Sequence, residues 1–141
     1  MTRQDERLLR RAVTLAGVAR KAGEAPFGSL LAERGGRVLA EEHNTVLSDN
    51  DITAHPELKL ARWAAQTLDA VEAATVTMYT SCEPCQMCAG AIARSNLGQV
   101  VFAMSTAQLN ALKASGAIDA TPARGPALFN EALAAVEGYY D

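Results

Sequence analysis

The chain has 141 residues, of which 49% are hydrophobic and 21% charged, a length and composition typical of one globular domain with a buried core. Its 13 Lys and Arg residues against 16 Asp and Glu residues give a formal net charge of −3, which argues against a nucleic-acid-binding protein because phosphate contacts require a surplus of basic side chains. The sequence has no apolar run of signal-peptide type or of membrane-spanning length, and we expect a cytoplasmic protein that folds as one domain over residues 1–141.

The first predicted element is an amphipathic helix over residues 2–21, ended by Ala22-Gly23. Apolar side chains at helical spacing form the face that we expect to pack against the core. These residues are Leu8, Leu9, Ala12, Leu15, Ala16 and Ala19. Another side carries arginines with acidic residues between them, and we interpret it as a solvated surface rather than a nucleic-acid contact.

Two strands follow, over residues 29–33 and 37–42, and a Gly-Gly pair between them predicts a hairpin turn. A polar loop at residues 48–51 leads to a second helix that begins at His55 or Pro56. Proline is tolerated there because the first turn of a helix leaves its N–H positions unpaired in any case.

The rest of the chain continues the alternation of strands and helices. We predict a strand over residues 75–80, a helix over 85–95, a strand over 99–103, a helix over 105–115 and a last helix that begins at Pro126. Residues 117–125 have no clear pattern. This order predicts an α/β fold, a three-layer α/β/α sandwich with a mixed four- to five-stranded sheet.

Two short motifs carry the chemistry. Pro84-Cys85-Gln86-Met87-Cys88 offers two thiolates one helical turn apart, and His55-Pro56-Glu57 offers an imidazole and a carboxylate. Three cysteines in an apparently cytosolic chain indicate metal ligands sooner than disulfides. Glu57 shares its helix face with apolar residues, where an unpaired carboxylate is costly, which favours a chemical task for it. His-x-Glu followed by Pro-Cys-x-x-Cys is the signature of zinc deaminases.

With these motifs, the sequence resembles the cytidine-deaminase-like superfamily, and within it guanine deaminases and tRNA-adenosine deaminases. The resemblance rests on Pro26-Phe27-Gly28, His43-Asn44, Asp51 through Glu57, and Tyr79 through Ile92. Pro56 departs from the family, which usually has alanine there, and can reshape one pocket wall. Residues 126–141 contain no Lys or Arg, whereas the last helix of tRNA-adenosine deaminases is typically basic, and this counts against a tRNA substrate.

The resemblance implies a hydrolase that deaminates a free nucleobase or nucleoside, guanine or a related amino-azaheterocycle, and releases ammonia. Zn²⁺ is expected on His55, Cys85 and Cys88 with a fourth position for water, and Glu57 is expected to move the protons. The expected substrate contacts are Asn44 for the edge of the base, Phe27 as a wall, backbone groups of Ala54 and of Ser81 or Cys82, and Tyr139 and Tyr140 as a lid formed by residues 126–141. The resemblance also implies at least a homodimer.

Several alternatives stay open. A tRNA-specific adenosine deaminase or a cytosine deaminase would use the same motifs. A structural zinc module would add Cys82 as a fourth ligand, but it has no use for Glu57, and we interpret Cys82 as a small buried residue. A Cys-x-x-Cys redox protein leaves His55 and Glu57 unexplained. His43 is interpreted as a strand-end residue without a metal role, and Asp119 as a weak candidate for substrate contact.

Overall fold

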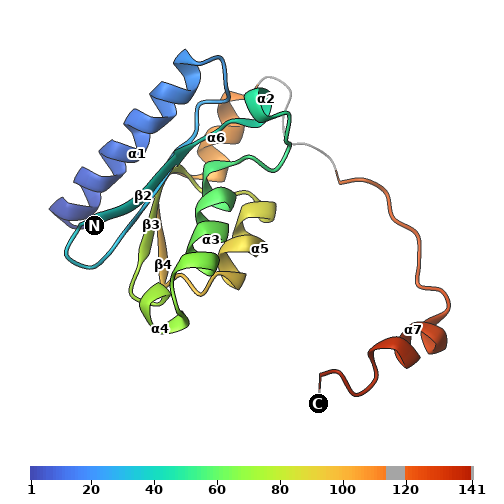
Figure 1. Cartoon of the computed structure of the whole chain (residues 1–141). Helices are drawn as coiled ribbons and strands as arrows, with labels where there is room; N and C mark the ends of the chain where they lie inside the picture. Colours follow the sequence, from blue (N-terminus) through green and yellow to red (C-terminus); the bar gives the residue numbers. More distant parts are fainter. Residues whose placement is uncertain (114–119, 141) are drawn as a thin grey trace.

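The computed structural model describes residues 1–113 and 120–140 of the chain (Figure 1). In chain order its elements are α1 (Arg3–Lys21), β1 (Gly28–Ala32), β2 (Val38–His43), α2 (Val46–Asp49), α3 (Pro56–Thr67), α4 (Ala70–Ala73), β3 (Thr77–Cys82), α5 (Gln86–Arg94), β4 (Gln99–Met104), α6 (Thr106–Leu112) and α7 (Phe129–Val136). No helix within these ranges has an apolar stretch that could cross a membrane.

The four strands form one mixed sheet in the order β2-β1-β3-β4. β1 pairs antiparallel with both β2 and β3, and β3 pairs parallel with β4. Helix α1 covers one face of the sheet, and α3 and α5 lie side by side on the other (Figure 1). The predicted α/β class and mixed sheet are therefore confirmed.

The central strand β1 separates two apolar clusters, and all five of its residues are buried. Successive side chains of a strand point to opposite faces, so Leu30 packs with Leu8 of α1 while Leu31 packs with Leu60 of α3. Helix α1 comes very close to the start of this strand. A Cβ atom built on Gly28 would lie 2.5 Å from the Ala16 nitrogen, which explains glycine at this position.

Helix α1 has the predicted buried face without exception. Thr2 caps it, since the Thr2 hydroxyl accepts from the Asp5 N–H and the Asp5 carboxylate accepts from the Thr2 N–H. The same carboxylate accepts a hydrogen bond of 2.7 Å from the hydroxyl of Tyr79 on β3. Burial and the neighbouring Asp5 raise the pKa of Tyr79 to about 12, so the hydroxyl keeps its proton and the contact persists across the neutral range.

Two short helices differ from the predicted pattern. Residues 48–51 look like a polar loop in the sequence, but the helical turn of α2 includes Ser48 and Asp49 while residues 50–51 lie outside it, and α4 forms another turn before β3. A single turn is too short to show a periodic pattern. Because Thr75 closes the turn after α4, with its hydroxyl donating to the Glu72 carbonyl, β3 begins at Thr77 and not at residue 75 as predicted.

The C-terminal segment is the part that departs most from the expected arrangement. Helix α7 begins at Phe129, three residues after the predicted start at Pro126, and stands away from the sheet and its helices (Figure 1). The apolar side chains of the segment are exposed: Leu128, Phe129, Leu133, Val136, Tyr139 and Tyr140. Helix α6 has Ser105 as its N-cap residue, and part of its predicted range lies outside the described residues.

Candidate active site

Two helix N-termini bring the predicted metal ligands together. His55 is the N-cap residue of α3, Cys85 is the N-cap residue of α5, and Cys88 lies in the first turn of α5. Pro56 occupies the first helical position after His55, where proline fits without losing a hydrogen bond. Since α3 and α5 pack against each other, the imidazole and the two thiols meet at the start of both helices.

The distances within this trio suit a tetrahedral zinc ion. The His55 Nδ1 atom lies 3.7 Å from Cys85 Sγ and 3.4 Å from Cys88 Sγ, and all three atoms lie within 4.8 Å of one another. Zinc with bonds of about 2.3 Å to sulfur and about 2.0 Å to nitrogen at a tetrahedral angle places an N and an S ligand about 3.5 Å apart. In residues 1–113 and 120–140, no other trio of such side chains meets this test.

The surroundings of the trio favour a cation. Burial lowers the pKa of His55, which keeps the imidazole neutral, as a metal ligand must be. Burial, together with the nearby charges of Glu57 and Cys85, raises the pKa of the Cys88 thiol. A thiolate at that position therefore requires a positive charge beside it, and a bound divalent ion provides one.

Glu57 lies beside the trio without being part of it. It is on the first turn of α3 and only 7% exposed. This agrees with the prediction that Glu57 lies on the inward-facing side of its helix. The Ser29 hydroxyl lies 3.4 Å from Glu57 Oε1 and 2.7 Å from the Thr80 hydroxyl. Burial raises the pKa of Glu57, and a carboxyl group with a raised pKa is suited to accept a proton and return it.

A cavity of about 210 Å³ opens onto these groups. Its lining consists of Phe27, His55, Pro56, Glu57, Cys82, Glu83, Cys85, Leu109 and Lys113. Leu109 and Lys113 were not predicted to lie there, because nothing in the sequence near α6 indicates that this helix reaches the mouth of the site. The contact of Ser29 with Glu57 was also not predicted, because a single serine in an apolar strand gives no indication of a functional role.

Asn44 lies directly behind the Phe27 wall. Its N–H donates to the Phe27 carbonyl at 3.0 Å, and its side-chain oxygen accepts from the Val46 N–H at 3.0 Å. The residue is 3% exposed. Among the described residues no hydrogen bond uses the amide nitrogen of Asn44, but Asn44 is not among the residues that line the cavity, and its contact with a substrate remains a prediction.

Two other predicted substrate contacts are engaged within the protein. The N–H of Ala54 donates to the Asp51 carbonyl, and its carbonyl accepts from the Thr45 N–H. The Ser81 hydroxyl accepts from the N–H of Gly28. Both residues are buried beside the site, and their role in binding remains a prediction.

Other candidates fall outside the trio. Cys82 is half-buried and lines the cavity, but it is not part of the metal-binding group among the described residues. His43 contacts the Asn44 carbonyl through Nδ1 and has no place in that group either. Tyr139 and Tyr140 are 79% and 85% exposed and are not among the residues that line the cavity of their own chain. Asp119 lies outside the described residues.

Comparison with known proteins also indicates a zinc-binding site of deaminase type. A family model described as the cytidine and deoxycytidylate deaminase zinc-binding region matches residues 2–104. Guanine deaminase of Bacillus subtilis (strain 168) is 46% identical over 88 residues, which are 62% of this chain and 56% of that protein. The tRNA-specific adenosine deaminase of Haemophilus influenzae is 34% identical over 108 residues, 77% of this chain and 62% of that protein. The chain thus spans less than two thirds of either curated relative.

The similarity extends to solved structures. The X-ray structure of guanine deaminase from Bacillus subtilis matches with a TM-score of 0.76 at 31% sequence identity, over 99% of this chain and 94% of that chain.

Proposed function

Since this chain belongs to the cytidine and deoxycytidylate deaminase zinc-binding family, we propose that it deaminates a free nucleobase of guanine type. The family accounts for a hydrolase that acts on C–N bonds. The observation that supports a specific chemistry is that His55, Cys85 and the buried Glu57 line one cavity, with the thiol of Cys88 completing the trio beneath it.

The residues divide the reaction between them. His55, Cys85 and Cys88 would hold a zinc ion, and that ion would supply Lewis-acid activation of a water molecule. Glu57 accepts one proton from the attacking water and delivers it to the ring nitrogen, and it then takes the second proton from the new carbon-bound hydroxyl and passes it to the departing amine. The carbon–oxygen bond forms, the carbon–nitrogen bond breaks, ammonia leaves and a carbonyl remains on the ring.

Three features support a small base as the substrate. The cavity, at about 210 Å³, is below the range of about 300–1,000 Å³ typical of sites for drug-sized ligands, which suits a flat ring better than a nucleotide. The free amide nitrogen of Asn44 suits a base that presents a carbonyl oxygen. Guanine deaminase of Bacillus subtilis is also 46% identical over the matched segment.

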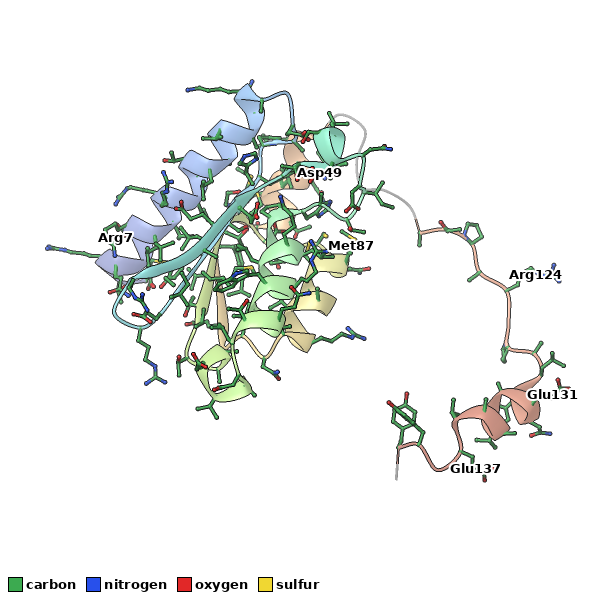
Figure 2. All side chains as sticks on the ribbon, in the orientation of Figure 1. Arg7, Asp49, Met87, Arg124, Glu131 and Glu137 are labelled. Carbon is green, nitrogen blue, oxygen red and sulfur yellow. The ribbon has the colours of Figure 1, made fainter. Side chains whose placement is uncertain are left out.

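A second candidate is deamination of adenosine in tRNA. It is favoured by the tRNA-specific adenosine deaminase of Haemophilus influenzae, whose match covers 77% of this chain. The charge of the C-terminal segment counts against it, because α7 and the residues after it carry Glu131 and Glu137 but no Lys or Arg (Figure 2).

Ammonia release by the zinc-loaded protein tests the proposal. The panel is guanine, guanosine, cytosine, cytidine, adenine, ammeline and a tRNA anticodon stem-loop, with the Glu57→Gln variant as the blank. We expect the highest kcat/KM with guanine or a related amino-azaheterocycle. Turnover of the stem-loop alone would favour the second candidate, and a parent protein no faster than the blank on every compound would contradict both.

The C-terminal segment suggests how the site is completed. Its apolar side chains are exposed, and Tyr139 and Tyr140 do not reach the cavity of their own chain. Exposed apolar surface of this kind marks an interaction site. We propose a homodimer in which the two tyrosines of one copy cover the cavity of the other.

Removing residues 139–141 tests this lid. We expect kcat/KM to fall by about tenfold or more, because an uncovered site admits water and holds the base loosely, while circular dichroism shows an unchanged fold. Mixing the truncated chain with full-length Glu57→Gln chain should restore activity if the lid acts between copies. Parental kinetics after truncation, or no recovery in the mixture, would contradict the proposal.

A further inference from the structure

We propose that Lys59 is a positioning residue that holds the turn carrying Asn44 against the helix that carries His55 and Glu57. This inference rests on the proposed function, because it concerns how the substrate-reading amide is kept at a fixed place relative to the reacting centre. Sequence motifs give no indication of it, since Lys59 belongs to neither the His-x-Glu nor the Cys-x-x-Cys pattern.

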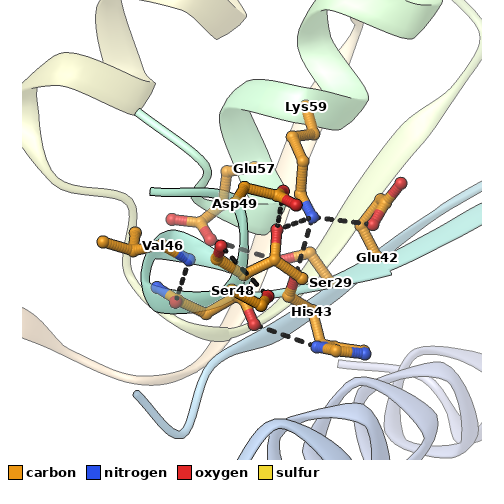
Figure 3. Close-up of polar contacts among 10 residues, drawn as sticks. Ser29, Glu42, His43, Val46, Ser48, Asp49, Glu57 and Lys59 are labelled. Carbon is orange, nitrogen blue, oxygen red and sulfur yellow. Dashed lines mark hydrogen bonds and ion pairs between the residues drawn. The ribbon is translucent and has the colours of Figure 1, made fainter. Parts of the chain in front are cut away.

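Lys59 lies on the first turn of α3, two residues after Glu57, and its side chain is only 13% exposed. Its ammonium group makes three short contacts, at 2.9 Å to the His43 carbonyl, 2.8 Å to the Thr45 hydroxyl and 2.9 Å to Glu42 Oε2 (Figure 3). A lysine has three N–H donors, and all three are used here.

Two of these acceptors flank Asn44 on either side. The His43 carbonyl precedes Asn44 in the chain, and the Thr45 hydroxyl follows it. Lys59 therefore holds the Asn44 turn through the backbone of the residue before Asn44 and the side chain of the residue after it. The helix that provides the holding group also begins with the metal ligand and carries the proton-transferring carboxylate, so one rigid element fixes all three functions.

Other hydrogen bonds also stabilise this turn, and comparison with them shows what the Lys59 contacts contribute. The Glu24 carboxylate accepts from the N–H groups of Leu47 and Ser48, and the Thr45 hydroxyl donates to Asp49. These bonds stabilise the turn internally and attach it to the segment after α1. Among the described side chains, only Lys59 connects this turn by hydrogen bonds to α3. Without it, the turn can shift relative to Glu57 while keeping its own shape.

The energetic consequence appears in substrate binding. If the Asn44 amide moves away from the base, the hydrogen bond that it makes is weakened, and a hydrogen bond contributes up to about tenfold in an equilibrium constant. The zinc ligands and Glu57 are untouched. We therefore expect Lys59→Met, which keeps the length of the stem, to raise KM about tenfold and to change kcat much less.

A double-mutant cycle separates positioning from general stability. In a chain that already carries Asn44→Ala, adding Lys59→Met should cause no further change in KM, because the group that Lys59 positions is gone. Arg11→Met is the matched control. Arg11 pairs with Glu41 on the opposite face of β2, so this variant removes an ion pair to the same strand and should leave KM unchanged.

Hydrogen exchange provides a measurement that does not depend on activity. The N–H groups of Asn44, Thr45 and Val46 are all hydrogen-bonded, and their protection should fall in Lys59→Met but not in Arg11→Met. Thr45→Val, which removes one acceptor of Lys59, should give the same changes to a smaller extent and serves if Lys59→Met does not fold.

The outcomes are distinguishable. Unchanged protection of residues 44–46, unchanged KM, or additive effects of Lys59→Met and Asn44→Ala would each overturn the positioning role. If the parent protein releases no ammonia from any base, the proposed function fails, and the exchange measurement still decides whether Lys59 holds the turn. Reduced protection with a raised KM that vanishes in the Asn44→Ala chain would establish it.

Discussion

Replacing Glu57 with glutamine is expected to lower kcat by about 10²–10⁴-fold, the range for removing a general acid–base group. Glutamine has nearly the same shape, so the packing of the first turn of α3 is kept. It cannot take up and return a proton in the neutral range. The Ser29 hydroxyl can still donate to the amide oxygen, so the fold around the site should not change.

The measurement is steady-state ammonia release together with zinc content and thermal unfolding. Zinc per chain should equal that of the parent, because Glu57 is not part of the His55, Cys85 and Cys88 trio. Ser29→Ala is a suitable control, since it alters the contact to Glu57 but removes no proton carrier, and it should cost much less activity. Turnover by Glu57→Gln near the parental rate would contradict the assigned role.

Cys88→Ser is the second change with a large expected effect. Cys88 is fully buried at the start of α5, and serine is a poor zinc ligand whose hydroxyl does not ionise near neutrality. We expect zinc affinity to fall by more than the ~100-fold typical of losing a partner that merely supports a ligand. Activity should disappear with the zinc. The melting temperature should also fall, because metal binding energy contributes to folding.

Cys82→Ser is the matched control for this experiment. Cys82 is also a partly buried cysteine beside the cavity, but it lies outside the metal-binding trio. Zinc content measured by elemental analysis should therefore stay at the parental level in Cys82→Ser. If Cys82→Ser lost zinc as Cys88→Ser does, the site would have four protein ligands, and the structural zinc module would become the better interpretation.

The metal site could be predicted because its chemistry is local in the sequence. The spacing of Cys85 and Cys88 places both thiols on one helical turn, and the inward position of Glu57 follows from its neighbours on α3. The buried face of α1 could be predicted in the same way, from a regular pattern over nineteen residues. In each case the pattern that carries the prediction lies within one element or one short motif, although the metal site itself joins α3 and α5.

Features that depend on contacts between distant segments could not be predicted. The acceptors of Lys59 come from the end of β2, fourteen and sixteen residues earlier in the chain, and the sequence shows nothing that connects them. Leu109 and Lys113 line the cavity, and the start of α6 is tied to the site by the Thr106 N–H, which donates to the Glu83 carboxylate 23 residues earlier. The exposed position of α7 has no signature either, since an amphipathic helix looks the same whether its apolar face is covered or free.

The contact between Tyr79 and Asp5 has a consequence for synthesis on the ribosome. It joins residues 74 positions apart, and the central strand β1 likewise needs β3 as its second neighbour. Helix α1 leaves the ribosome before β3, so its apolar face has no completed sheet to cover it until β3 has been made. Long-range pairing of this kind is slow, and until it is complete it leaves aggregation-prone hydrophobic surface exposed. The nascent chain should therefore depend on holding chaperones until β3 has left the exit tunnel.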